Sequence, residues 1–151
     1  MRFTFPFETL LNMKKNLEEL SQMRLAKKMN HLREQEEAIQ RVMEEIVSND
    51  RALKEKSEQG MKPSEYLVYK IYQEDRAKDL LLKRAALRQT KKEIEAEQKT
   101  LLQLMKERKM FERLKEKQWK KFQSQMERLD QKNSDEMVIT RYRPSPNINL
   151  S

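Results

Sequence analysis

Apolar residues recur every three or four positions along the first part of the chain, the spacing that places side chains on one face of an α-helix. The apolar positions are Leu10, Met13, Leu17, Leu20, Leu25, Met29, Leu32, Ile39, Met43, Ile46 and Leu53. From Leu25 onward the spacing alternates between four and three residues, with Glu36 and Asp50 as polar members, which predicts a coiled-coil seam. Between Leu20 and Leu25 the phase slips, and a route through Ser21 predicts a four-residue stutter.

A second series, with a period of seven residues, occupies the later part of the chain. Its members are Leu80, Leu87, Ile94, Leu101, Arg108, Lys115, Phe122 and Leu129. Alternate positions are filled by Leu104, Phe111, Leu114 and Met126. This pattern predicts a second long helix that also carries a coiled-coil seam.

A break between the two series predicts a turn. Gly60 is the only glycine of the chain, and Pro63 follows it closely. Glycine tolerates the left-handed conformation that ends many helices, and proline followed by Ser64 suits a helix start. We expect a first helix over about residues 5–58, a loop over about 59–63 and a second helix over about 64–134.

So short a loop makes consecutive helices antiparallel neighbours. The predicted fold is therefore all-α, with residues 1–151 forming a single domain in which two long helices make an antiparallel coiled-coil hairpin. In such a hairpin, the residue numbers of two residues that face each other add up to roughly 123. Ile39 then faces Leu87, and the apolar stripes of the two helices coincide.

In this register Met1 lies opposite about residue 121, and the second helix continues beyond it. The continuation carries Phe122, Met126 and Leu129, with Trp119 just before them. An apolar stripe that nothing covers indicates contact with another chain. The alternatives are that the first helix slides further along the second, or that the end of the second helix frays.

Each end of the chain has a pattern of its own. Phe3, Phe5 and Phe7 alternate with other residues, and we interpret them as a hydrophobic staple that packs the start of the first helix onto the second. After Ser134, residues 137–142 favour extended backbone, and two prolines then prevent a continuing helix. We expect residues 137–151 to form a flexible tail.

Composition narrows the possible functions. The chain has one glycine and no cysteine, which excludes glycine-rich phosphate loops and cysteine-bound zinc. His31 is the only histidine, and carboxylates such as Glu36 lie on solvated helix faces, so neither a metal site nor acid–base catalysis is indicated. We expect no enzyme activity, no cofactor and no small-molecule substrate. No stretch approaches the ~20 apolar residues of a membrane span.

Charge is unevenly distributed along the chain. The net charge is +8, and residues 99–121 contain nine basic and three acidic residues. Such a segment suits an acidic protein surface or nucleic acid, although a solvated helix face is the plainer alternative.

Tyrosines gather at the start of the second helix. Tyr66, Tyr69 and Tyr72 follow one another at three-residue intervals among further apolar residues. Exposed tyrosines on a helix are typical of protein-binding surfaces. They could instead cover the end of the hairpin.

Several segments together resemble a known family. They are the opening Phe3–Leu11 with Lys14 and Lys15, the turn Gly60–Tyr66, the segment Phe111–Phe122, and the ending with Asp135, Glu136 and Ile139–Tyr142. In this combination the chain resembles, over nearly its whole length, the FliJ family of flagellar type III export proteins. Phe111–Phe122 is the most specific part of the resemblance.

The resemblance implies a stalk similar to the γ subunit of rotary ATP synthases, with its terminal end inside the ring of the hexameric flagellar export ATPase. The residues it implies for ring binding are Trp119, Phe122, Met126, Leu129, Lys117, Lys120 and Lys121. It also implies contact with export chaperones, and a cytoplasmic location at the inner face of the membrane, at the flagellar base.

The resemblance further implies contact with the cytoplasmic domain of the export gate protein FlhA. The candidates for this contact are Tyr66, Tyr69 and Tyr72. Tyr72 matches an aromatic position of the family, whereas Arg76 and Lys83 depart from its pattern. Three alternatives remain: an injectisome stalk protein of YscO type, a basic coiled coil that binds nucleic acid, and a coiled coil that dimerises through Phe122–Leu129.

Overall fold

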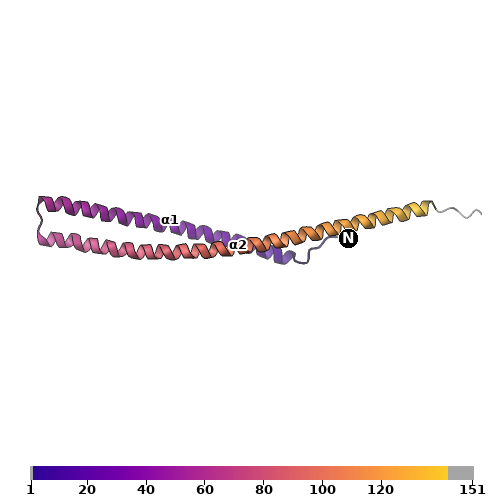
Figure 1. Ribbon diagram of the computed structural model, residues 1–151, viewed down its shortest axis with the longest axis horizontal. Helices are drawn as coiled ribbons and strands as arrows, with labels where there is room; N and C mark the ends of the chain where they lie inside the picture. The colour runs from indigo at the N-terminus through magenta and orange to yellow at the C-terminus, as the bar shows by residue number, and fades with distance from the viewer. Residues whose placement is uncertain (1, 143–151) are drawn as a thin grey trace, which may run out of the picture. The chain divides into compact units, whose positions relative to one another are not determined.

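The computed structural model describes residues 2–142 and contains two helices joined by a short loop (Figure 1). Helix α1 spans Glu8–Gln59 and helix α2 spans Pro63–Arg141. No strand occurs in the described part of the chain, and the predicted all-α helical hairpin is confirmed. The contacts divide the chain into two units. The hairpin unit is Asn16–Met105, and in the terminal unit the residues up to Lys15 pack on the residues from Lys106 onward.

The turn of the hairpin unit is built by Gly60 and Pro63. Gly60 has a φ of 98°, in the left-handed region that glycine adopts at little cost. Pro63 is the first residue of α2, where the N–H that it lacks would have no helical acceptor. The carbonyl of Lys62 accepts hydrogen bonds from the N–H groups of Glu65 and Tyr66, both at 3.1 Å. These bonds start α2 directly after the loop.

The buried side of α1 in the hairpin unit agrees with the prediction at Leu25, Leu32, Ile39, Ile46 and Leu53 and differs at the positions between them. A series of buried and half-buried residues runs along it in steps of three and four: Glu18, Ser21, Leu25, Lys28, Leu32, Gln35, Ile39, Val42, Ile46, Asn49 and Leu53. The spacing is unbroken, so the predicted stutter was wrong. Val42 is 3% exposed, whereas Met43, which the apolar pattern placed in the seam, is 40% exposed.

The reason for this difference is that polar residues occupy several seam positions of α1. A prediction from apolar residues alone then selects neighbouring apolar positions, which lie one residue to the side of the seam. The same shift leaves several other predicted seam members exposed: Leu17, Leu20, Met29, Glu36 and Asp50.

The seven-residue series on α2 is confirmed in the hairpin unit. Leu80, Leu87 and Leu101 are half-buried and Ile94 is buried. The seam positions between them are polar: Gln73, Arg76, Lys83, Thr90 and Glu97. Polar residues in a coiled-coil seam reduce stability but favour one register and one orientation of the helices.

Hydrogen bonds between the helices define that register. The amide of Gln73 donates to a carboxylate oxygen of Asp50 at 2.9 Å, and the numbers of this pair satisfy the predicted sum. The numbers of Arg76 and Glu45, whose side chains are 2.9 Å apart, sum to two less than the predicted value, a difference of less than one helical turn. The predicted antiparallel register is therefore confirmed in the hairpin unit.

In the terminal unit, residues 2–7 precede α1 as a non-helical segment, here called the N-terminal arm. Phe5 is 7% exposed, and Leu11 of α1 is 1% exposed. The ring of Phe7 lies 6.1 Å from that of Phe111 on α2. The N-terminal arm therefore packs onto the second helix as the staple interpretation predicted, although α1 begins at Glu8 rather than near residue 5.

Helix α2 continues to Arg141, beyond the end expected near Ser134. Residues such as Val138 and Ile139 are β-branched, which suggested extended backbone, but they extend an existing helix, and propagation costs far less than nucleation. The hydroxyl of Thr140 donates to the carbonyl of Glu136 at 2.7 Å within this last segment. The part of the predicted flexible tail from residue 143 onward lies outside the described residues.

Candidate protein-interaction surface

Two of the aromatic residues considered for ring binding are packed against the N-terminal arm. The ring of Phe3 lies 5.1 Å from that of Trp119 and 5.5 Å from that of Phe122. Trp119 and Phe122 stack on each other at 5.8 Å, and Trp119 remains 42% exposed. The expectation that nothing from this chain covers Phe122 was therefore wrong.

The position of this contact follows the predicted register. The numbers of Phe3 and Trp119 sum to 122, and those of Glu8 and Lys115 sum to 123. The ring of Phe3 therefore lies where the register places it, and it also contacts Phe122, about one turn further along α2.

Beyond Phe122 the apolar face of α2 is uncovered in the terminal unit. Met126 is half-buried, Leu129 is 44% exposed, and every residue from 127 to 142 is exposed. An open groove of about 380 Å³ is lined by Phe122, Gln125, Met126, Arg128, Leu129 and Lys132. Two cations border its apolar floor, which suits an apolar segment with acidic flanks. We call Met126 and Leu129, with this groove, the distal face.

Cations also stand beside the aromatic cluster. Lys117, Lys120 and Lys121 are exposed, and Lys120 forms a surface ion pair with Glu116 at 3.3 Å. An exposed pair of this kind contributes little to stability. These lysines therefore leave most of their positive charge accessible to another molecule.

At the start of α2 the three tyrosines have different environments. Tyr66 and Tyr72 are 46% and 40% exposed, while Tyr69 is half-buried at a seam position. The tyrosines are thus not one continuous patch. The larger exposed apolar surface in this segment comes from Leu67, Val68 and Ile71. A shallow groove of about 460 Å³ beside Tyr72 is lined by Arg41, Glu44, Glu45, Ser48, Asn49 and Ala52.

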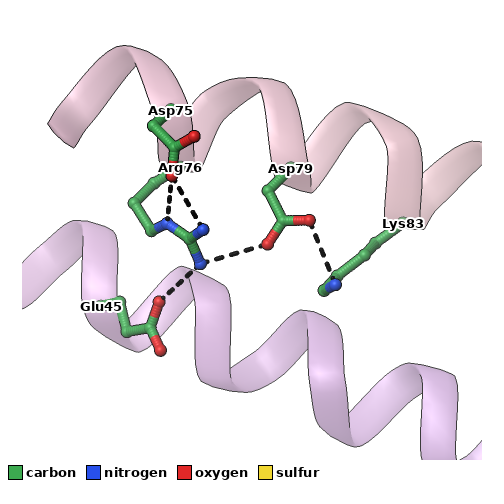
Figure 2. Close-up of polar contacts among 5 residues, drawn as sticks. All are labelled: Glu45, Asp75, Arg76, Asp79 and Lys83. Carbon is green, nitrogen blue, oxygen red and sulfur yellow. Dashed lines mark hydrogen bonds and ion pairs between the residues drawn. The ribbon is translucent and has the colours of Figure 1, made fainter. Parts of the chain in front are cut away.

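Arg76 and Lys83, the two charged departures from the family pattern, have carboxylate partners in the hairpin unit. Figure 2 shows the guanidinium of Arg76 between Glu45 of α1 and two carboxylates of α2. Asp79 joins the two cations, at 3.1 Å from each. Hydrogen bonds to Asp75 and Glu45 raise the pKa of Arg76 further above its ordinary value. Both cations therefore serve the seam between the helices.

A second polar cluster lies deeper in the hairpin unit. The hydroxyl of Ser21 donates to a carboxylate oxygen of Glu97 at 2.7 Å, and Lys28 lies 3.5 Å from the same carboxylate. The hydrogen bond from Ser21, and then the charge of Lys28, lower the pKa of Glu97. Ser21 itself is 2% exposed, so this cluster stabilises one pairing of the helices and is inaccessible to a partner.

The features that would indicate chemistry are not found in the part of the chain that the structure describes. Over residues 2–142 no three metal-binding side chains form a group, and neither helix contains a stretch apolar enough to cross a membrane. The side chain of His31 is 61% exposed and lies 4.0 Å from Glu34. The fold and its uncovered apolar faces therefore define a helical-hairpin protein whose accessible features are surfaces for other molecules.

Comparison with known proteins identifies the family. The family described as "Flagellar FliJ protein" matches residues 3–147. The chain belongs to the FliJ family of flagellar export components. No curated protein and no solved structure matched this chain.

Proposed function

We propose that this protein is the central stalk of the flagellar export apparatus, inserted by the end of α2 in the ring of the hexameric export ATPase. The observation that carries the proposal is the distal face. Met126 and Leu129 lie on α2 beyond Phe122, whose ring the N-terminal arm contacts through Phe3. Such an exposed apolar face requires a binding partner with an apolar surface of its own.

The distal face continues the surface that already binds the start of the chain. Lys115, Phe122 and Leu129 are seven residues apart, and so lie on the same side of α2. Lys115 binds Glu8 at 2.8 Å, and Phe122 contacts Phe3. Burying a Met or Leu side chain contributes ~1.5–3 kcal/mol, so a partner that covers the distal face gains substantially.

The neighbouring lysines support a partner with acidic loops. Lys117, Lys120 and Lys121 lie on α2 just before or beside Phe122 and are exposed. Charges at the rim of an interface accelerate association and orient the partner. In the proposed complex Trp119, Phe122, Met126 and Leu129 contact the inner wall of the ring, and the three lysines meet carboxylates there.

A stalk can influence an ATPase ring only through contacts that differ among its subunits. The distal face lies on a single helix. It forms the apolar side of that helix, and the other sides are polar. A ring subunit that meets the apolar side is stabilised in a different state from one that meets a polar side. Such differential affinity is the thermodynamic requirement for the stalk to bias the ring.

We assign the second contact, with the cytoplasmic domain of FlhA, to the start of α2. Tyr66 and Tyr72 are its exposed aromatic residues, Tyr69 is half-buried in the seam, and the shallow groove beside Tyr72 extends the surface onto α1. This contact would hold the protein at the inner face of the membrane, at the flagellar base. Engagement of export chaperones completes the proposed role.

The test is stimulation of the purified export ATPase by the full chain. The variant Met126→Asp/Leu129→Asp should raise the concentration for half-maximal stimulation at least about 100-fold, because two apolar contacts of ~1.5–3 kcal/mol each are lost. Met23→Asp is the matched control, since Met23 is 64% exposed and lies in the hairpin unit. Unchanged stimulation by the double variant, with its helix content intact, would remove the stalk proposal.

A further inference from the structure

The terminal unit uses its basic residues in two different ways. On the side of α2 that packs on the start of the chain, cations are neutralised. Lys115 pairs with Glu8 at 2.8 Å, and Lys14 of α1 pairs with Glu107 at 2.6 Å. These pairs belong to the packing between the two segments, and their charge is balanced within the unit.

A second set of cations does not pair with the start of the chain, although one of its members, Lys120, pairs with Glu116 of the same helix. It consists of Lys106, Lys109, Arg113, Lys117 and Lys120, here called the basic stripe, and all five are exposed. Steps of three and four residues place them on one side of α2. Among the described residues, Lys106, Lys109 and Arg113 form no ion pair. The positive charge of this side is therefore open to solvent.

The basic stripe faces away from the N-terminal arm. The residues of α2 that contact the start of the chain include Phe111, Lys115 and Phe122. The stripe residues lie about half a helical turn away from these positions. Met110, which is 57% exposed, lies within the stripe and adds an apolar contact among the cations.

We propose that the basic stripe binds an anionic phospholipid surface. Its cations form a straight row of ~20 Å along one helix, and a flat layer of phosphate headgroups can contact every member of such a row at once. Each Lys or Arg near an anionic bilayer strengthens binding about fivefold. An exposed apolar residue among cations is typical of helices that lie at a membrane interface.

The same observations favour a lipid surface over nucleic acid. Single-stranded nucleic acid is held by aromatic side chains on which bases stack, and the basic stripe contains none. The ring of Trp119, next to Lys120 in the sequence, is stacked on Phe122 and in edge contact with Phe3.

Lys117 and Lys120 of the stripe are also assigned to the ATPase ring, so these two lysines contact lipid only when they are not in the ring. Lys106, Lys109 and Arg113 belong to the stripe alone, so variants at these three positions test lipid binding separately from the stalk proposal. ATPase stimulation, measured without lipid, reports the ring contact separately.

The experiment is flotation of the full-length protein with vesicles of phosphatidylcholine, with or without phosphatidylglycerol. The test variant is Lys106→Gln/Lys109→Gln/Arg113→Gln, and Lys78→Gln/Lys91→Gln/Lys92→Gln is a control with the same loss of charge at exposed sites of the hairpin unit. We expect the unaltered protein to bind the anionic vesicles in about 0.1 M salt and to be released as salt shortens the screening length. The test variant should bind about 100-fold more weakly, at about fivefold per residue.

Three results would overturn the proposal. The first is an equal loss of binding in the control variant, which would mean that net charge alone acts. The second is equal binding to vesicles without phosphatidylglycerol. The third is a loss of duplex DNA binding in the test variant while vesicle binding is unchanged, which would assign the stripe to nucleic acid. Helix content measured by circular dichroism establishes that each variant is folded.

Discussion

The rings of Phe3 and Trp119 meet edge to face, with centroids 5.1 Å apart and planes inclined at 71°. This contact attaches the N-terminal arm to α2 immediately before the distal face. The first residues of the chain thus set the point at which the partner-binding surface begins. A partner that needs Trp119 meets a surface composed of both chain segments.

Replacing Phe3 by alanine tests this contact. Phe3→Ala should expose Trp119 and Phe122 to water, because two aromatic contacts worth ~0.5–1.5 kcal/mol each are removed. Trp119 is the only tryptophan, so its fluorescence emission should shift to longer wavelength. Tyr66→Ala, in the hairpin unit, is the control and should leave the emission unchanged. An unshifted spectrum in Phe3→Ala would mean that the arm is not bound there in solution.

A pair of neighbouring substitutions tests the phase of the α1 seam. Val42 is 3% exposed and Met43 is 40% exposed. Val42→Ala should lower the free energy of unfolding by about 1.5 kcal/mol, since two buried methylene equivalents are lost. Met43→Ala should lower it by less than about 0.5 kcal/mol. Urea unfolding followed by circular dichroism measures both, and the reverse order would restore the phase that the apolar pattern suggested.

At the turn, the cost of backbone strain can be measured separately from the effects of side-chain packing. A methyl group added to Gly60 would meet no atom within 4 Å, so its cost comes only from the left-handed backbone. Gly60→Ala should destabilise the hairpin by about 1 kcal/mol, and Gly60→Asn by less, because asparagine tolerates this conformation better. Equal thermal midpoints for the two variants and the unaltered protein would contradict the assigned turn.

The polar cluster of Ser21 and Glu97 predicts a pH-dependent contribution to stability. Because the pKa of Glu97 is lowered on folding, first by the Ser21 hydrogen bond, the ionised carboxylate stabilises the fold above the unfolded-state pKa. This stabilisation is lost as pH falls below the ordinary value of 4.5 and through the folded-state pKa. The effect of Ser21→Ala on the free energy of unfolding should therefore be larger at about pH 7 than at about pH 3, by about 1 kcal/mol.

Thr100→Ala is the matched control for this measurement. The hydroxyl of Thr100 donates to the carbonyl of Ala96 at 3.1 Å within its own helix. A backbone carbonyl does not titrate. The effect of Thr100→Ala on stability should therefore not change with pH. If Ser21→Ala behaves in the same way as this control, the link between Ser21 and the ionisation of Glu97 is refuted.

The sequence predicted those features that depend on local backbone chemistry. Gly60 and Pro63 were sufficient to place the turn, and with it the antiparallel hairpin, because their backbone preferences act within a few residues. On α1 the pattern placed Leu25, Leu32, Ile39, Ile46 and Leu53 in the seam correctly, but it missed polar seam positions such as Lys28, which has a partner on the other helix. A pattern of hydrophobicity assigns polar residues to solvent and carries no information about such partners.

The candidate site was predicted in part for a similar reason. The periodicity of α2 correctly extended an apolar face to Met126 and Leu129. It did not show that Phe3 covers Phe122, since the register places Phe3 opposite about residue 120 and does not describe how far its ring reaches along α2. In the sequence the basic stripe was only part of a run of positive charge. The ion pairs of Lys14 and Lys115 distinguish the neutralised cations of the terminal unit from those exposed to solvent.

Site-specific photo-crosslinking tests whether the distal face contacts the export ATPase ring. A photoreactive residue at position 126 should form a covalent adduct with the export ATPase, while the same residue at position 23, which is 64% exposed and lies in the hairpin unit, should form none. Adducts at position 23 alone, or no adduct at position 126 under conditions in which the ATPase is stimulated, would contradict the account.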